Sequence, residues 1–244
     1  MIPALLIGRE GSVGFPNKNV YPVLGRPLVA YPLMAARGAT LVDRVYVSTD
    51  SPRIREIAEG MGATVLHRPP ELCTSAALGE HVFVHGYRTI RDSAGEEIEI
   101  VVLLFANAPT VLPGTINEGI RVLRAHPEYD SAVTVSRYNM WSPLRARKIG
   151  GDGLLHPFVP FETFGDPRTL NCDRDSQGDV WFADMGLSIV RPRCLEHLEE
   201  GLLPQKWMGQ RIFPLEQWGG LDIDYEWQLP QAEFWLRKHG FTEA

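Results

Sequence analysis

Residues 5–19 read LLIGREGSVGFPNKN, an apolar run that stops at a glycine and opens into a loop with three glycines, one arginine and one lysine. The whole apolar run, from Ile2 to Ile7, is typical of a strand buried on both faces of a parallel sheet. In an open α/β sheet, ligands bind at the carboxyl ends of the strands, which is where this loop lies. The stretch therefore predicts the first strand of such a sheet and the floor of a ligand site.

The rest of the first half repeats an alternation of apolar runs with amphipathic segments. Strands are expected at 44–49, 63–66, 98–105 and 131–136, and helices at 27–37, 52–60, about 75–91 and from 113. Short connections between alternating strands and helices are typical of a parallel sheet covered on both faces. The expected fold is α/β, with a Rossmann-like mixed, mainly parallel sheet and helices on both faces.

Between residues 138 and 180 this rhythm breaks. The segment contains scattered prolines, basic residues and a Gly-Gly-Asp-Gly turn at 150–153. We interpret it as an irregular insertion, a β-arm or a lid, within a single α/β domain that spans residues 1–244. Regular structure is expected to return with a strand at 181–190, a short helix near 192–200, a strand at 211–215 and a closing helix at about 228–239.

Composition narrows the class of protein. The 244 residues are 44% hydrophobic and 22% charged, which argues against disorder. The formal net charge of −6 argues against a nucleic-acid-binding protein, because phosphate backbones attract clustered Lys and Arg. The three cysteines, Cys73, Cys172 and Cys194, suggest neither a disulfide framework nor a zinc site. No apolar run approaches the roughly 18 residues of a membrane span, so we expect a cytoplasmic protein.

The opening loop has the features of a phosphate cradle. Its glycines allow backbone N–H groups to approach an anion, and Arg9 and Lys18 supply positive charge. A tight strand-to-helix turn with two solvated basic residues would look the same at this level. The loop lacks the Gly-Lys-Ser/Thr ending of a P-loop and the spacing of a dinucleotide-binding fingerprint.

A second candidate site lies near the end of the chain, in Gly-Gly-Leu-Asp-Ile-Asp at residues 219–224. On an extended segment, residues two apart point the same way, so Asp222 and Asp224 can converge on one hard cation such as Mg²⁺. The alternative is that Asp224 is the N-cap of the closing helix and Asp222 a turn residue.

Other patterns in the sequence favour structural interpretations. His81 and His85 have helical spacing for a metal, but no third ligand accompanies them, so a solvated or core-edge pair is the favoured interpretation. No serine lies in a G-x-S-x-G elbow. The six tryptophans concentrate in the second half of the chain and are expected in the core or at a subunit interface.

Taken together, the motifs resemble the acylneuraminate cytidylyltransferase family of the nucleotide-diphospho-sugar transferase superfamily. In that family the first strand leads into A-R-x-x-S-K-G-x-P-x-K-N. The positions of this chain that keep the pattern are Arg9, Ser12, Gly14, Pro16, Lys18 and Asn19. Further matches are Leu-Gly-Arg-Pro-Leu at 24–28, Val-Ser-Thr-Asp at 47–50, Arg-Pro-Pro-Glu-Leu at 68–72 and Leu-Asp-Ile-Asp at 221–224.

Departures from the family pattern fall mainly on the acceptor side. Val13 stands where the family usually has a lysine, and the family's L-L-Q-P-T-S-P-L-R segment reads LLFANAPTV at 103–111. Ser75 replaces an aspartate after the Arg-Pro-x-Glu-Leu motif, and Met185 precedes Gly186 where relatives have Asn-Gly. The motifs implied to bind the nucleotide therefore match the family pattern better than the motifs implied to bind the acceptor.

The resemblance implies a transfer of CMP from CTP to an acidic sugar, sialic-acid-like or another 2-keto-3-deoxy sugar acid, with release of pyrophosphate. It implies Mg²⁺, or Mn²⁺, on Asp222 and Asp224, and triphosphate binding by Arg9 and Lys18. The remaining positions implied to bind nucleotide are Gly8, Ser12, Gly14, Asn19 and Arg68. Those assigned to the acceptor are Asn107, Arg145 and, more weakly, Arg174.

The family also implies that residues 138–180 form a dimerisation subdomain whose basic residues reach the partner's acceptor site, in a homodimer. For Arg145 and Arg174 the alternative is a solvated surface charge. Two other functions stay open at this point. The same fold could use another nucleoside triphosphate or a phosphonate or phosphate acceptor, or the protein could bind nucleotide without turnover.

Overall fold

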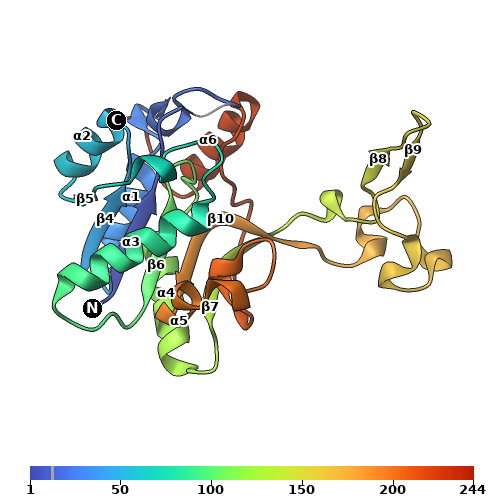
Figure 1. Ribbon diagram of the computed structural model, residues 1–244. Helices are drawn as coiled ribbons and strands as arrows, with labels where there is room; N and C mark the ends of the chain where they lie inside the picture. The colour runs from blue at the N-terminus through green and yellow to red at the C-terminus, as the bar shows by residue number, and fades with distance from the viewer. Residues whose placement is uncertain (12–13) are drawn as a thin grey trace.

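A seven-stranded sheet forms the centre of the computed structural model, which describes residues 1–11 and 14–244 (Figure 1). The strand order is β11-β7-β10-β6-β1-β4-β5. The strands are β1 (Pro3–Ile7), β4 (Arg44–Ser48), β5 (Thr64–Leu66), β6 (Val101–Phe105), β7 (Ser131–Arg137), β10 (Trp181–Val190) and β11 (Ile212–Gln217). Only β10 runs antiparallel to its neighbours β6 and β7, so the mixed, mainly parallel sheet is confirmed.

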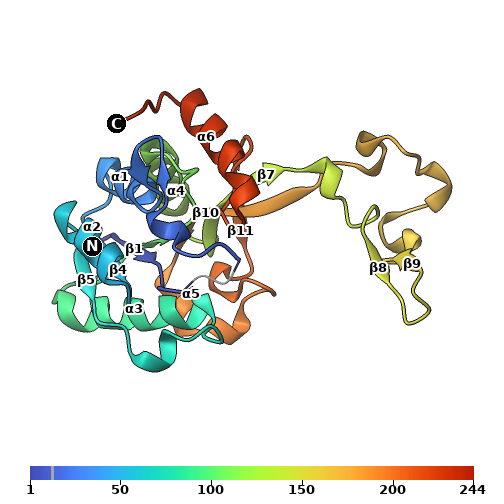
Figure 2. The ribbon, with the colours of Figure 1, turned by 90° about the horizontal axis from the view of Figure 1, so that it is seen from above.

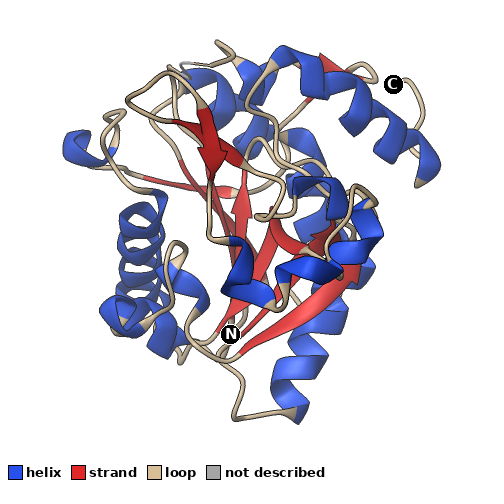
Figure 3. Ribbon diagram, turned by 90° about the vertical axis from the view of Figure 1, so that its right-hand side faces the viewer, coloured by secondary structure: helices blue, strands red, loops and turns tan. Residues whose placement is uncertain are grey.

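Helices cover both faces of this sheet (Figure 3). They are α1 (Ala30–Gly38), α2 (Pro52–Gly60), α3 (Gly79–Ala94), α4 (Pro113–Ala125), α5 (Pro192–Glu196) and α6 (Leu229–Lys238). Alternate residues of β1 point to opposite faces, so Leu6 packs in the cluster with α1, α2 and α4, whereas Leu5 packs in the cluster with α3 and α5. The apolar run at the start of the chain is thus buried on both faces, as a parallel strand should be.

A third apolar cluster brings the two ends of the chain together. Trp235 and Leu236 of α6 pack with Phe15 from the opening loop and with Leu221 and Ile223 from the segment that carries the two aspartates. The backbone N–H of Ile223 also donates to the carbonyl of Asn107, just after β6. The closing helix therefore holds the Asp-Ile-Asp segment against the loop that follows β1.

Two helices begin later than the sequence predicts. The helix predicted from residue 27 begins at Ala30, because Pro27 instead pairs with Pro22 in a two-stranded ribbon formed by β2 (Pro22–Val23) and β3 (Arg26–Pro27). The helix predicted from about 75 begins at Gly79. By contrast, α2 begins where expected, since the Ser51 side chain accepts a hydrogen bond from the N–H of Ile54.

Of the two places expected for the tryptophans, the core and a subunit interface, the core takes only two of the six. Trp207 and Trp235 are buried, but the other four are 42–63% exposed. These four are Trp141, Trp181, Trp218 and Trp227. They lie near the start and end of the segment between β7 and β10 and on either side of the Asp-Ile-Asp segment, not under the sheet.

The chain between β7 and β10 projects from the body as a separate arm (Figures 1 and 2). It contains the hairpin of β8 (Arg147–Ile149) and β9 (Leu155–Pro157) and several 3₁₀ turns. Six large apolar side chains of the arm are 60–75% exposed, namely Trp141, Ile149, Leu154, Leu155, Phe158 and Phe164. An arm of this kind has too little buried apolar surface to form a core of its own.

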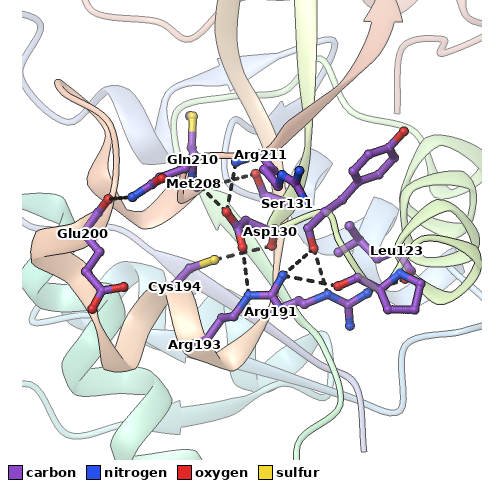
Figure 4. A network of polar contacts seen from close by, with 12 residues as sticks. Leu123, Asp130, Ser131, Arg191, Arg193, Cys194, Glu200, Met208, Gln210 and Arg211 are labelled. Atoms are coloured by element: carbon purple, nitrogen blue, oxygen red, sulfur yellow. Dashed lines mark hydrogen bonds and ion pairs between the residues drawn. The ribbon is translucent and has the colours of Figure 1, made fainter.

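Asp130 organises the opposite end of the sheet from the opening loop (Figure 4). Its carboxylate accepts hydrogen bonds from the backbone N–H groups of Gln210 and Arg211, both at 2.9 Å, and from Nε of Arg193 at 2.8 Å. Nearby, the Arg191 guanidinium donates to the carbonyls of Leu123 and His126 at the end of α4. This network fixes α4, β7, α5 and the start of β11 to one another.

Candidate functional site

The loop after β1 and the Asp-Ile-Asp segment meet at the carboxyl end of the sheet. Lys18 Nζ lies 2.5 Å from Asp224 Oδ1, and this ion pair joins residues 206 positions apart. A Cβ atom on Gly14 would lie 2.8 Å from the carbonyl oxygen of Asp224, so only glycine allows this close approach. Asp224 is not the N-cap of the closing helix, because Gln228 takes that position and Tyr225 caps the 3₁₀ turn before it, so the capping alternative for Asp224 is wrong.

Most of the residues expected to bind nucleotide line one cavity of about 440 Å³, which we call the nucleotide cavity. Those that do so are Gly8, Arg9, Gly14, Lys18, Asn19 and Arg68, together with Asn107 and Asp224. They come from the loop after β1, the segment after β5, the end of β6 and the chain before α6. A volume of a few hundred cubic ångströms is typical of small-molecule sites.

Arg68 places a buried positive charge at this cavity. Only 6% of the residue is exposed, and its guanidinium donates to the Ser48 hydroxyl and to the carbonyls of Gly8 and Ser48. Burial lowers the pKa of Arg68 despite the nearby charge of Asp50. Its hydrogen-bond partners are neutral oxygens, so the cation is desolvated without a bonded carboxylate among the described residues. Such a group is suited to an anionic ligand.

Asn19 contributes a buried hydrogen-bond acceptor to the cavity. It is 7% exposed, and its Nδ2 donates to the carbonyl of Arg9 at 3.2 Å, which orients the amide. Its Oδ1 is buried without a hydrogen-bond partner among the residues that the structure describes. An unpaired buried acceptor is costly, so this oxygen is suited to a hydroxyl or a water brought by a ligand.

Asp222 is the most perturbed carboxyl group of the site. Burial, and then the charge of Asp224, raise the pKa of Asp222 to about 6, although Lys18 and the Asn107 amide act in the opposite direction. Asn107 Nδ2 donates to Asp222 Oδ2 at 3.2 Å and to the carbonyl of Ile223 at 3.0 Å. Two close carboxylates, one of them desolvated, are a favourable setting for a cation.

The donor set fits Mg²⁺ bound together with a ligand. Over residues 1–11 and 14–244, no group of three or more His, Cys, Asp and Glu side chains is arranged to hold a metal. Mg²⁺ is commonly held by one or two carboxylates and completed by phosphate oxygens and water, which is what Asp222 and Asp224 would offer. Among the described residues, His81 and His85 belong to no such group.

Some predicted residues are not brought to the cavity, among them Asp222, which lines a second cavity next to it. Ser12 and Val13 lie outside the described residues, so their predicted roles remain predictions. Arg145 and Arg174 lie on the arm, and Arg145 lines a separate hollow there with Arg147 and Phe161. Within one chain, neither arm arginine lines the cavity of Asp224.

The structure adds three residues that sequence reasoning did not assign to the site. Tyr225 and Phe105 line the cavity, and Asp50 accepts a hydrogen bond from the N–H of Glu10 at 2.9 Å, which ties the loop to the end of β4. Asp50 ends the Val-Ser-Thr-Asp motif, which was a usable signal. Phe105 stands at the position of a family glutamine, which gives no signal for a role in the site.

Among the described residues, no helix has both the length and the apolar character to cross a bilayer.

Comparison with known proteins identifies the relatives of this chain. A family model described as cytidylyltransferase matches residues 3–148. N-acylneuraminate cytidylyltransferase of Oncorhynchus mykiss is 26% identical over 243 residues, which are 98% of this chain and 51% of that protein. The enzyme of the same name from Escherichia coli is 33% identical over 138 residues, which are 57% and 32% of the two chains. The chain thus spans about half the length of the first of these relatives.

Among solved structures, CMP:2-keto-3-deoxy-manno-octonic acid synthetase complexed with CTP is similar to this chain with a TM-score of 0.68. The match covers 98% of this chain and 99% of the other at 14% sequence identity. At that identity the likeness shows the shared fold. It agrees with the α/β architecture described above.

Proposed function

The chain belongs to the cytidylyltransferase family, and we propose on that premise that it transfers CMP from CTP to an acidic sugar and releases pyrophosphate. The observation that carries the proposal is the junction of the glycine-rich loop with the Asp-Ile-Asp segment through Lys18 and Asp224. It places cationic side chains and the Asp224 carboxylate at one cavity, with Asp222 next to them in the wall of a neighbouring cavity, a setting suited to transfer from a metal-bound triphosphate. The names of the relatives support an acid of the sialic or 2-keto-3-deoxy class.

In the proposed reaction a hydroxyl oxygen of the acceptor attacks the α-phosphorus of CTP. The bond from that phosphorus to the bridging oxygen breaks, pyrophosphate leaves, and the hydroxyl proton passes to solvent. Catalysis of such a transfer comes mainly from positioning and charge neutralisation. Arg9 and Lys18 would bind the β- and γ-phosphates, and the loop with Gly8 and Gly14 would let backbone N–H groups approach them.

Arg68 and Asn19 would contact the nucleotide in different ways, Arg68 through its charge and Asn19 through a hydrogen bond. The buried Arg68 cation would attract the nucleotide's negative charge. The unpaired Oδ1 of Asn19 cannot accept from a phosphate oxygen, so it would accept from a hydroxyl or a bound water. Asn107, bonded to Asp222, would orient that carboxylate at the acceptor side of the cavity.

Mg²⁺ or Mn²⁺ would be held by Asp222 and Asp224, and when bound it would neutralise charge that develops on the phosphates. The raised pKa of Asp222 supports this assignment, because a carboxylate that is costly to ionise alone gains most from a cation. In the structure Lys18 pairs with Asp224 and so supplies part of the positive charge that the metal would supply.

We also propose a homodimer formed through residues 138–180. The exposed apolar side chains of the arm would be buried by a second copy, and Arg145 and Arg174 would reach the partner's acceptor site. The support is the arm's projection from the body (Figure 1) and the exposure of its large apolar side chains. A cytoplasmic location remains the prediction made from the sequence.

The experiment is pyrophosphate release measured with CTP, Mg²⁺ and a panel of sialic, ketodeoxy, phosphonate and phosphate acceptors. Release that requires both CTP and a sugar acid supports the proposal. Release with a phosphonate or phosphate alone would move the acceptor to that class. A protein that binds CTP, as judged by a raised melting temperature, but releases no pyrophosphate with any acceptor would be a binding protein instead.

A further inference from the structure

A second cavity, of about 620 Å³, opens on the other side of Asp222. Six aromatic side chains dominate its lining, namely Tyr138, Trp141, Phe182, Trp218, Trp227 and Phe234. We call it the aromatic cavity. Its rings come from both ends of the arm, from the turn after β11 and from the chain that forms α6, so the sequence scatters them over nearly a hundred residues.

The aromatic cavity shares a wall with the candidate metal site. Asp222 lines it, whereas Asp224 lines the nucleotide cavity, and Asn107 connects the two by bonding Asp222 from the nucleotide side. A group in the aromatic cavity therefore lies next to the carboxylate pair on the side away from the triphosphate. With the triphosphate bound in the nucleotide cavity, as proposed, an acceptor on this side would be placed for in-line attack on the α-phosphorus.

The lining has a distinct chemistry. Trp141, Trp218, Trp227 and Phe234 are 57–63% exposed, an unusual concentration of large apolar surface in one hollow. Of the described residues that line it, none is a lysine or an arginine. Lys238 Nζ lies 4.7 Å from the centroid of the Trp218 ring but does not line the cavity. The cavity thus offers mainly apolar contact, and the acid group of an acceptor would belong at the Asp222 end, where the metal would be held and Lys18 is near.

Two glutamines place amide groups among the rings. Gln228 and Gln231 lie three residues apart and both line the cavity. The Oε1 of Gln228 accepts from the N–H groups of Asp224 and Tyr225, at 2.7 and 2.8 Å, which fixes that side chain and leaves its NH₂ as the group able to donate. A mainly apolar hollow with few fixed polar groups is typical of a small-molecule specificity site.

Resting on the proposed function, we propose that the aromatic cavity selects the acceptor, and that the biological acceptor is an acid with a bulky apolar substituent, a ring or an acyl chain longer than acetyl. The hydroxyl groups of a fully hydroxylated sugar acid would lose hydrogen bonds to water when they lie against these rings. They would gain few new hydrogen bonds there. An apolar chain would instead bury its surface and displace water from exposed tryptophans.

The test compares three 3-deoxy-nonulosonic acids that differ only at one carbon, where they carry a hydroxyl, an N-acetyl or an N-hexanoyl group. The rate of pyrophosphate release at saturating CTP gives kcat/KM for each. We expect kcat/KM for the hexanoyl acid to be at least about tenfold higher than kcat/KM for the hydroxyl acid, because one methylene in an apolar pocket can change kcat/KM by that factor. Phe234→Ala and Trp227→Ala should reduce this preference at least about fivefold.

Trp181→Ala is the matched control, because Trp181 is 42% exposed but does not line the cavity, and its variant should keep the preference. Equal kcat/KM for the three acids in the unaltered protein would overturn the proposal. So would variants that lower all three values alike, or that change only the monomer–dimer balance, which would make the cavity a subunit interface.

A second readout separates this proposal from the proposed function. The probe 8-anilinonaphthalene-1-sulfonate is both aromatic and anionic, and its fluorescence in the aromatic cavity should fall when the hexanoyl acid displaces it, without any CTP. If no acid supports pyrophosphate release, the proposed function fails. Displacement by the hexanoyl acid and not by the hydroxyl acid would then still support the cavity's selectivity, and equal or absent displacement would overturn it.

Discussion

Lys18 and Asp224 are ion-paired at 2.5 Å across the mouth of the nucleotide cavity. In the proposed cycle the lysine is needed by the triphosphate and the carboxylate by the metal. The pair therefore neutralises two groups that the ligands would later separate. A metal-bound nucleotide satisfies both at once, whereas free metal or free triphosphate would leave one of them unpaired.

Replacing Lys18 by glutamine removes that cation from the cavity. We expect the affinity for CTP to fall about 10- to 100-fold, the value of a charge-assisted hydrogen bond of about 1.5–3 kcal/mol. The rise in melting temperature with CTP concentration measures it. Lys206→Gln is the control, since Lys206 pairs with Glu199 away from the cavity. Equal CTP affinity in the Lys18 variant would remove the lysine from the triphosphate site.

Asp222→Asn should separate stability from activity. The pKa of Asp222 is raised to about 6, so its native-state charge opposes folding above that pH and the opposition disappears below about pH 4. Without metal, the variant should be more stable than the unaltered protein by about 1–2 kcal/mol at pH 7.5, after allowance for the residue's partial exposure, and no more stable at pH 4. Urea unfolding at the two pH values measures this.

The same substitution should lower kcat by about 10²–10³, as loss of one electrostatic group does in other active sites. A variant that is destabilised at pH 7.5, or that keeps full activity at saturating CTP, would contradict the assigned environment of Asp222.

Asp130→Asn tests the network at the far end of the sheet. Burial raises the pKa of Asp130, but hydrogen bonds from the backbone of Arg211 and Gln210 and from Arg193 outweigh it, so the net pKa is lowered. The stability supplied by this carboxylate is complete above the unfolded pKa of about 4 and is lost as pH falls through the lower native value.

We expect the Asp130 variant to lose about 1–3 kcal/mol of unfolding free energy at pH 7 and much less at pH 3, with kcat/KM unchanged. Denaturant unfolding and the pyrophosphate assay check the two halves of this expectation. A change in kcat/KM at a temperature where the variant is folded would mean that the far end of the sheet is coupled to the site.

Charged substitutions on the arm test the proposed dimer. Leu155 and Phe158 are 71% and 60% exposed, so the double variant Leu155→Glu, Phe158→Glu should fold normally and sediment as a monomer, whereas the unaltered protein should sediment as a dimer. Leu202→Glu, at a site 53% exposed on the body, should stay dimeric. An unaltered protein that sediments as a monomer at micromolar concentration would refute the arm's role.

Local patterns predicted the sheet well, because each β-α unit carries its own signals. The apolar run of β1, the Ser51 cap and the proline that starts α4 were all usable in isolation. The helix start predicted at Pro27 was wrong, because the sequence alone does not distinguish a proline at a helix start from a proline in a two-stranded ribbon.

The site could be assembled from the sequence only in part. The loop and the two aspartates were recognisable as motifs, but their contact depends on α6 packing Trp235 against both segments, which no local pattern encodes. The aromatic cavity was missed for the same reason. Its tryptophans resembled core residues, and only the placement of the arm and α6 shows them exposed around one hollow.

The most direct test of cytidylyl transfer is ³¹P NMR of a mixture of CTP, Mg²⁺ and a 2-keto-3-deoxy sugar acid with the unaltered protein and with Asp222→Asn. We predict equal amounts of pyrophosphate and a new CMP phosphodiester, formed only when the acid is present, only with CTP among the four ribonucleotides, and at least a hundredfold more slowly with the variant. Pyrophosphate formed without the phosphodiester, or formed equally by the variant, would contradict the account.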